Sequence, residues 1–140
     1  MKEDYEALAK NPANFTALTP LSFLQRTADI YGGREAIIYG DRSYTWRQCH
    51  ERCLRMAASL TELGIGKGDT VAVLAFNTPE MFEAHFFVPM TGAVLNTINT
   101  RLDAETLAYI LDFGEVKALF VDRELLPLTE SALQITKSNP

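Results

Sequence analysis

The stretch TVAVLAFNTPEMFEAHFFVPMTGAVLNTINTRL, residues 70–102, decides the fold, because it changes from strand to helix and back to strand. Residues 70–75 are apolar along their whole length, which is typical of a strand covered on both faces. Asn77 or Thr78 can cap the helix that follows. A second apolar run over residues 93–98 then predicts another strand, so the stretch predicts a β–α–β unit.

The same alternation continues towards the C-terminal end. Residues 103–113 predict a helix and residues 117–121 a strand, and a weaker helical pattern covers residues 124–136. Strands that alternate with helices of this length are typical of right-handed crossovers and a mostly parallel sheet. The predicted fold class is therefore α/β, built from β–α–β units. The last residues predict no closing element, so the layer is expected to be incomplete.

Local signals also predict the elements before this region. Thr19 can cap a helix that starts at Pro20, and two extended segments flank Gly40-Asp41 as a hairpin would. Thr45 and the glutamine three residues later form a capping box at the start of a long helix. Its apolar stripe is expected to contain Trp46, Cys49, Cys53, Met56, Leu60 and Leu63.

Composition restricts the class of protein. The chain has 140 residues, of which 47% are hydrophobic and 22% charged, as in globular domains. A net charge of −5 and a pI near 5.0 argue against nucleic acid as a partner. No apolar run is long enough to span a membrane, and residues 1–5 lack the apolar core of a signal peptide. We therefore expect a soluble, intracellular protein, either cytoplasmic or peroxisomal.

Several motifs that suggest chemistry are better explained by structure. GIGKGD, residues 64–69, has the glycines of a phosphate cradle, but it follows a helix and precedes a strand, so we interpret it as a helix stop and turn. Glu80, Glu83 and His85 do not share one helix face, and no metal site is predicted. Cys49 and Cys53 are expected to be reduced, buried thiols, and no catalytic triad motif is present.

The polar segment over residues 96–101 is the remaining candidate. It follows a strand and leads into a helix, and ligands of open α/β sheets gather beyond the carboxyl ends of the strands. Arg101 suits a phosphate or carboxylate. Two interpretations stay open at this point. The segment either faces a ligand, or forms a capping turn in which Arg101 makes a structural salt bridge.

Three further stretches carry a resemblance to a known family. SYTWRQ (residues 43–48), PMTGAVLNTINTRL (89–102) and LDAETLAYILDFGEVKALFVD (102–122) occur in the order and spacing of the adenylate-forming, AMP-binding acyl-CoA synthetase superfamily. The resemblance covers roughly residues 18–125. The sequence of these stretches is most similar to that of ligases that act on short- or medium-chain fatty acids or on aromatic acids, such as the plant acyl-activating enzymes.

The resemblance implies a two-step reaction. In the family, a carboxylic acid reacts with ATP and Mg²⁺ to give an acyl-adenylate, and the thiol of CoA then displaces AMP. The glycine- and hydroxyl-rich loop that holds the phosphates of ATP is absent from this sequence. The resemblance therefore implies the N-terminal portion of an acid–thiol ligase, with residues 1–17 as a flexible arm and residues 18–140 as an incomplete AMP-binding domain.

On the same grounds, the chain alone is expected to be inactive and to bind none of these cofactors tightly, and its macromolecular partner is the remainder of the ligase. Arg101 matches the arginine that the family can place near the phosphates of CoA. Two alternatives remain: a non-catalytic α/β scaffold or interaction module, and another adenylate-forming enzyme, such as a carrier-protein ligase or a luciferase-like protein.

Overall fold

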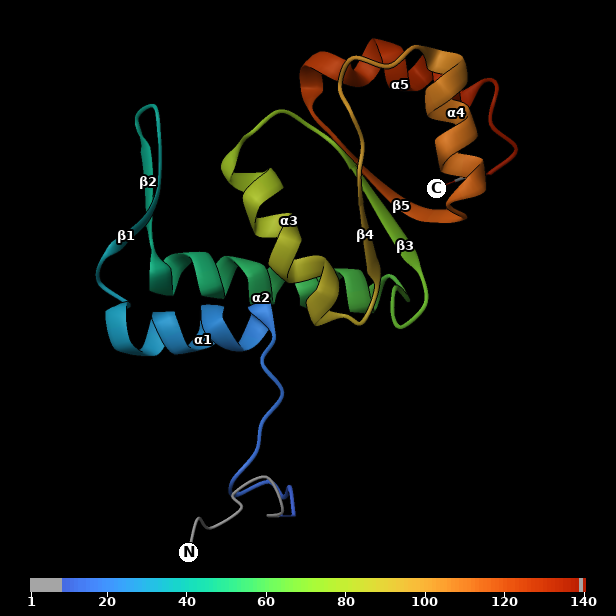
Figure 1. The fold of residues 1–140 in the computed structure, drawn as a ribbon. Helices are drawn as coiled ribbons and strands as arrows, with labels where there is room; N and C mark the ends of the chain where they lie inside the picture. The colour runs from blue at the N-terminus through green and yellow to red at the C-terminus, as the bar shows by residue number, and fades with distance from the viewer. Residues whose placement is uncertain (1–8, 139) are drawn as a thin grey trace, which may run out of the picture.

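The computed structural model describes residues 9–138 and 140, and its elements follow the predicted order (Figure 1). The N-terminal half holds one hairpin and two helices, and the C-terminal half alternates strands with helices. The elements are α1 (Pro20–Tyr31), β1 (Glu35–Tyr39), β2 (Arg42–Thr45), α2 (Trp46–Glu62), β3 (Thr70–Leu74), α3 (Pro79–Met90), β4 (Val94–Thr97), α4 (Ala104–Phe113), β5 (Val116–Val121), the 3₁₀ helix η2 (Arg123–Leu125) and α5 (Leu126–Leu133).

The predicted α/β fold class is confirmed. In the part of the chain that the structure describes, β3 lies at the centre of a three-stranded parallel sheet with the order β4-β3-β5. Thr70 pairs with Val94 on one side, and Leu74 pairs with Val121 on the other. The hairpin of β1 and β2 is a separate antiparallel pair. The chain therefore forms two consecutive β–α–β units, β3-α3-β4 and β4-α4-β5, and their strands lie in one sheet.

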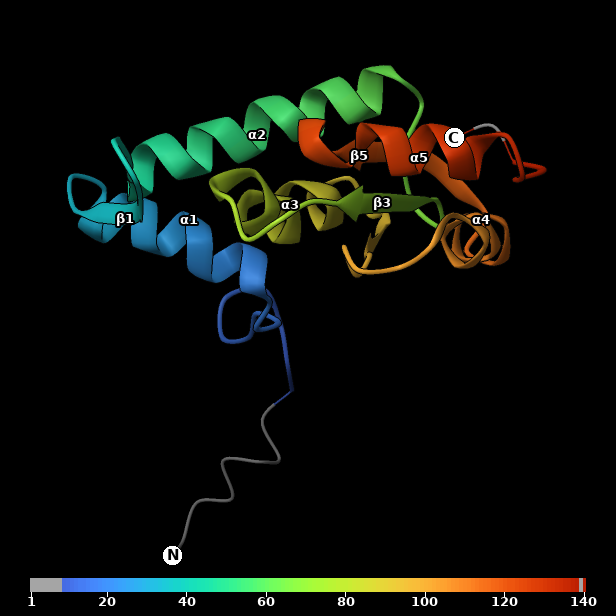
Figure 2. The ribbon, with the colours of Figure 1, turned by 90° about the horizontal axis from the view of Figure 1, so that it is seen from above.

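Strand β3 separates two cores because successive side chains point to opposite faces of a sheet. Val71 and Val73 pack with residues of α2 and α3, whereas Ala72 and Leu74 pack with residues of α4 and α5. All four side chains are buried, as the apolar run predicted. Figure 2 shows β3 between these two groups of helices, with α2 on one side and α4 on the other. Both faces of the central strand are thus covered.

Helix α2 begins with the predicted capping box. The side chain of Thr45 accepts a hydrogen bond from the amide of Gln48, and the side chain of Gln48 accepts one from the amide of Thr45. The predicted stripe is wrong at one residue, because Leu63 is 76% exposed. It is the C-cap residue of α2, beyond the last turn that faces the core, and Ala57 is buried in the stripe instead.

The hairpin turn also follows its sequence signal. Gly40 has a φ of 55° and is the first of the two turn residues between β1 and β2, the position where tight hairpins favour glycine. The turn sets Tyr39 opposite Arg42 and Ile38 opposite Ser43.

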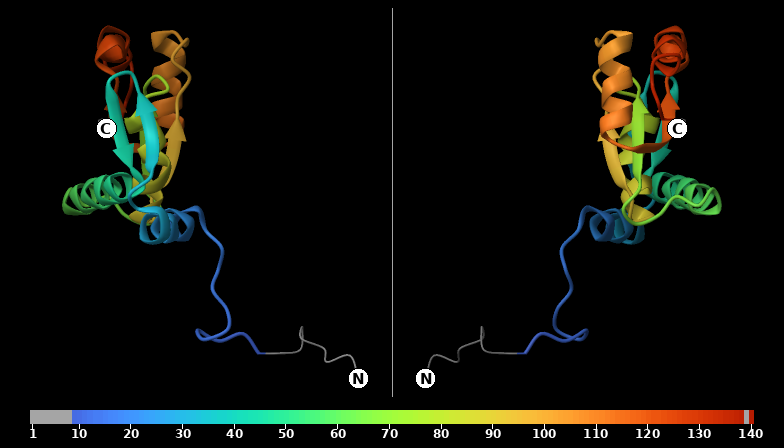
Figure 3. Two further views of the ribbon diagram at one scale, coloured as in Figure 1. Left: turned by 90° about the vertical axis from the view of Figure 1, so that its left-hand side faces the viewer. Right: turned by 90° about the vertical axis from the view of Figure 1, so that its right-hand side faces the viewer.

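The segment before α1 is exposed and leads away from the helices, as Figure 3 shows. It contains a turn in which the amide of Phe15 donates to the carbonyl of Asn11, at 2.9 Å. Residues 1–8 of the predicted arm lie outside the described residues. The boundary at residue 18 therefore stays a prediction. Among the helices that are described, none has the length and apolar character needed to cross a bilayer.

Candidate functional site at the carboxyl edge of the sheet

The carboxyl ends of β3, β4 and β5 meet at one edge of the sheet, at the top of Figure 1. The ladder extends one step past the strands, because the amide of Ile98 donates to Val73 and that of Asp122 donates to Leu74. The polar segments that follow the three strands therefore start side by side. Ligands of open α/β sheets bind at this edge, so it is the candidate site.

Arg101 lies on this edge, in the loop between β4 and α4. The side chain is exposed, and its backbone amide donates to Oδ1 of Asn99 at 2.9 Å. Within the described residues the guanidinium of Arg101 has no carboxylate within 4 Å and no hydrogen bond, so the alternative of a structural salt bridge finds no partner there. The guanidinium is therefore available to a ligand.

Asp103 explains how the loop ends. Its carboxylate accepts hydrogen bonds from the amide and the hydroxyl of Thr106, at 2.8 and 3.2 Å, and so caps α4. The bonds from Thr106 lower the pKa of Asp103 below its ordinary value. The N-terminus of α4 is thus occupied by a side chain of its own, and Arg101 is the cationic group that the loop presents.

A groove of about 510 Å³ borders this loop. Asn77, Met81 and His85 form one wall, and residues 97–100 form the other. The imidazole Nδ1 of His85 lies 2.9 Å from the carbonyl oxygen of Met81, which orients the ring. The groove is mixed in character, with amide, hydroxyl and imidazole groups next to apolar side chains. Sequence reasoning identified the loop but not the opposite wall.

On the other side of β3, a second groove of about 420 Å³ contains a network of charged side chains. Nε of Arg52 lies 2.5 Å from Oε1 of Glu83, and Nη2 lies 2.9 Å from Oε2. Glu83 is only 2% exposed. Local sequence does not mark Glu83 as buried, because its partner is 31 residues earlier, on α2. The hydrogen bonds that Arg52 donates to Glu83 raise the pKa of Arg52.

Glu80, one turn earlier on α3, completes the network at the surface. Nη1 of Arg42 donates to Oε1 of Glu80 at 2.7 Å, and this bond ties the hairpin to α3. Burial opposes the ionised form of Glu80, but the bond from Arg42, with helix N-terminal hydrogen bonds, outweighs it, and the pKa of Glu80 lies below its usual value. The network positions elements, and it offers no free carboxylate pair.

The glycine loop and the two cysteines have the structural roles that the sequence predicts. In GIGKGD, Gly64 has a φ of 82°, and the amide of Gly66 donates to Oδ2 of Asp69 at 2.9 Å, so the loop satisfies its own donors. Cys49 and Cys53 are free and buried. In the described part of the chain, no group of three or more potential ligands lies close enough together to hold a metal ion.

Known proteins match nearly the whole chain. The family model for AMP-binding enzymes matches residues 24–139. The acetate/butyrate–CoA ligase AAE7 (peroxisomal) of Arabidopsis thaliana is 49% identical over 132 residues, which is 94% of this chain and 23% of that protein. The peroxisomal benzoate–CoA ligase of the same plant is 50% identical over 131 residues, 94% of this chain and 23% of the relative.

Solved structures match as well. The anthranilate CoA ligase AuaEII, in complex with anthranoyl-AMP, superimposes with a TM-score of 0.79 at 28% identity, over 84% of this chain and 23% of that one. The N-terminal domain of FACL13 from Mycobacterium tuberculosis superimposes with a TM-score of 0.78 at 30% identity, over 85% of this chain and 30% of that one. The chain thus spans about a quarter of the length of the relatives it matches. The predicted resemblance is confirmed: the chain belongs to the family of AMP-binding enzymes.

Proposed function

We propose that this chain is the N-terminal part of an acid–thiol ligase, which activates a carboxylic acid with ATP to acyl-AMP and transfers the acyl group to CoA. The observation that carries the proposal is the 49% identity with an acetate/butyrate–CoA ligase over 94% of the chain. Relatives named for benzoate and for trans-cinnamate are 50% identical. The proposed substrates are therefore short- or medium-chain fatty acids or aromatic acids.

The described residues supply a frame, and they do not fit ATP or Mg²⁺. A cradle for the polyphosphate of ATP combines a glycine-rich loop with free amides at a helix N-terminus. The N-termini of α3 and α4, which lie at the carboxyl edge, already bond to the side chains of Thr78 and Asp103. No cluster of metal ligands is present in the same residues. We therefore assign the adenylation chemistry to other parts of the ligase, and this chain to positioning.

CoA fits the edge better, and Arg101 is the residue we propose to contact it. A guanidinium that is exposed and free of protein partners can donate to two phosphate oxygens at once. Arg101 orients the nucleotide end of CoA, so that the thiol reaches the acyl-adenylate bound elsewhere. The thiol then attacks the acyl carbonyl and AMP leaves, as in the proposed reaction.

The test is a chimera in which residues 1–140 replace the matching segment of the Arabidopsis acetate/butyrate–CoA ligase. We expect acyl-CoA formation within about tenfold of the parent enzyme, because the two sequences are 49% identical over 132 residues and cores tolerate volume-conserving substitutions. The chain alone is expected to show no exchange of pyrophosphate into ATP. A matched control carries Leu74→Asp, which places a charge in the core of the sheet and should abolish folding.

A chimera that folds but neither exchanges pyrophosphate nor forms acyl-CoA would contradict the proposal and favour a non-catalytic scaffold. A chimera that exchanges pyrophosphate but has lost only the CoA step would favour a different acceptor, as in carrier-protein ligases. The expected compartment is the cytoplasm or the peroxisome, and the relatives named as peroxisomal support the peroxisome. A fluorescent fusion of the whole ligase that contains this chain tests that assignment.

A further inference from the structure

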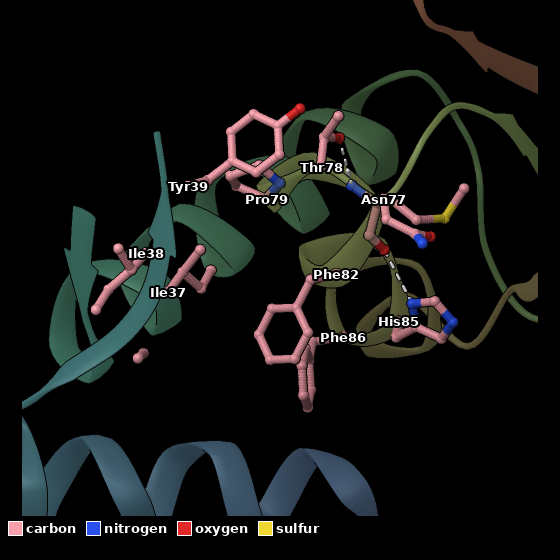
Figure 4. A pocket seen from close by; sticks show the side chains of 11 residues that line it. Ile37, Ile38, Tyr39, Asn77, Thr78, Pro79, Phe82, His85 and Phe86 are labelled. Carbon is pink, nitrogen blue, oxygen red and sulfur yellow. Dashed lines mark hydrogen bonds between the residues drawn. The ribbon is translucent and has the colours of Figure 1, made fainter. Parts of the chain in front are cut away.

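A third groove lies between the hairpin and α3, and it shares Asn77, Met81 and His85 with the groove beside the Arg101 loop. It is a groove of about 640 Å³, lined by consecutive residues 36–39 of β1 and, from α3, by residues that include Met81, Phe82 and Phe86. Figure 4 shows Ile37 and Ile38 on one side and the rings of Phe82 and Phe86 on the other. Four consecutive residues of one strand line the groove, so β1 borders it along its length.

The edge of β1 on this groove is unpaired in the described part of the chain, because β1 pairs with β2 alone. Tyr39 and Arg42 close the tight turn. In an antiparallel pair, hydrogen-bonded and non-hydrogen-bonded pairs alternate, and the pair next to a tight turn closes it with hydrogen bonds. Ile38, opposite Ser43, therefore points its amide and carbonyl away from β2. An unpaired strand edge is a template for another strand.

This edge has little of the usual protection against pairing, because Glu35 at its start is the charged residue of β1. Natural edge strands carry charged residues or proline. β1 has the sequence EAIIY, and Ile38 is 71% exposed and Tyr39 45% exposed. The opposite edge of the hairpin, along β2, carries Arg42 and Ser43. The two edges of one hairpin thus differ, and the apolar edge is the one that adjoins the groove.

We propose that the groove receives an extended strand, which pairs with β1 and places alternate apolar side chains against Phe82 and Phe86. The strand comes from the remainder of the ligase, so this inference rests on the proposed function. The chain spans 23% of the relatives' length, which leaves most of such a ligase to supply it. A strand fits better than a small amphiphile, because it satisfies the backbone groups of Ile38 as well as covering apolar side chains.

Amide hydrogen exchange, resolved to single residues in the chimera described above, tests the proposal. The amide of Ile38 should exchange at least about 100-fold more slowly than that of Ser43, its opposite on the outer edge of the same hairpin. The amide of Tyr39 is the internal control, since it bonds to β2 in either case. The readout does not depend on activity, so a chimera that fails as an enzyme still reports on the groove.

Equal and fast exchange at Ile38 and Ser43 overturns the proposal, because nothing then pairs with β1. Protection of Ile38 that disappears on dilution, together with a dimer in sedimentation, also overturns it, since a second copy is then the occupant. Protection that persists in the monomer supports the added strand.

Discussion

The guanidinium of Arg52 holds the carboxylate of Glu83 at two points, with Nε 2.5 Å from Oε1 and Nη2 2.9 Å from Oε2. The pair joins α2 to α3 beneath the hairpin, and the backbone of Glu83 also accepts a weak bond from the thiol of Cys53. Its carboxylate is buried while Arg52 keeps 29% of its side chain exposed. The ion pair thus fixes how the consecutive helices α2 and α3 lie against each other, in addition to their apolar contacts.

Removing one partner of this ion pair should lower the free energy of unfolding more than removing both partners. Arg52→Met leaves the buried carboxylate of Glu83 without a counter-charge, and we expect a loss of about 3 kcal/mol in the free energy of unfolding. The double variant Arg52→Met/Glu83→Leu should recover most of that loss, because apolar side chains can replace a buried pair. Urea unfolding, followed by the fluorescence of Trp46, measures both.

Arg42→Met is the matched control, since Arg42 pairs with Glu80 at the surface and should matter far less. If the double variant were no more stable than Arg52→Met alone, the pair would not be the cause of the loss.

Two glycines of the loop after α2 should respond oppositely to alanine. Gly64 has a φ of 82°, whereas Gly66 does not have a positive φ, and a methyl group would meet no atom within 4 Å at either position. Gly64→Ala should cost about 1–2 kcal/mol of stability, because a Cβ disfavours the left-handed conformation. Gly66→Ala should be neutral or stabilise by about 0.5 kcal/mol. The urea midpoints of the two variants measure these changes. Equal losses of stability at both positions would contradict an effect of the left-handed conformation of Gly64.

Local signals explain why so much of the fold is predictable. The caps at Thr19, Thr45 and Thr78 and the turn at Gly40 involve residues at most three apart, so they can be predicted from the local sequence. The buried Glu83 is different, since nothing near it in the sequence marks it as internal. Its environment depends on how α2 packs on α3. The prediction that Leu63 faces the core is wrong for a different reason. The helical spacing of apolar residues continues beyond the last turn of α2 that packs on the core.

One part of the candidate site could likewise be predicted from the sequence, and another part could not. The position of the loop that carries Arg101 follows from strand order alone, because parallel strands end at one edge. The groove opposite that loop depends on side chains of α3, which helical spacing assigns to no particular neighbour. Contact between CoA and Arg101 stays a prediction.

Asp112, at the end of α4, should make stability depend on pH. The hydroxyl of Thr136 and the amides of Ser138 and Lys137 donate to its carboxylate, and these bonds lower its pKa below the ordinary 3.8. Folding therefore favours the ionised form. The stabilisation is present above the unfolded pKa and is lost as the pH falls from about 4 towards the lower folded value.

The variant Asp112→Asn isolates this effect. It should be less stable than the parent chain at pH 7, and the difference in urea midpoint should shrink between pH 4 and pH 2.5. Asp29→Asn, which changes an exposed acid on α1, is the matched control and should show no such convergence. A difference for Asp112→Asn that stays constant over this range would mean that its carboxylate is not what holds residues 136–138.

Arg101→Ala, introduced into the chimera, should raise the KM for CoA about tenfold, because a charge-assisted bond to phosphate contributes roughly 1.5 kcal/mol. Exchange of pyrophosphate into ATP should be unchanged, since the described residues near Arg101 hold no site for ATP. Arg101→Lys keeps the charge but loses the fork of donors, and should restore part of the affinity. Arg26→Ala, an exposed arginine on α1, controls for loss of charge. An unchanged KM for CoA in Arg101→Ala would remove Arg101 from the binding site, and a parallel fall in pyrophosphate exchange would indicate structural damage instead.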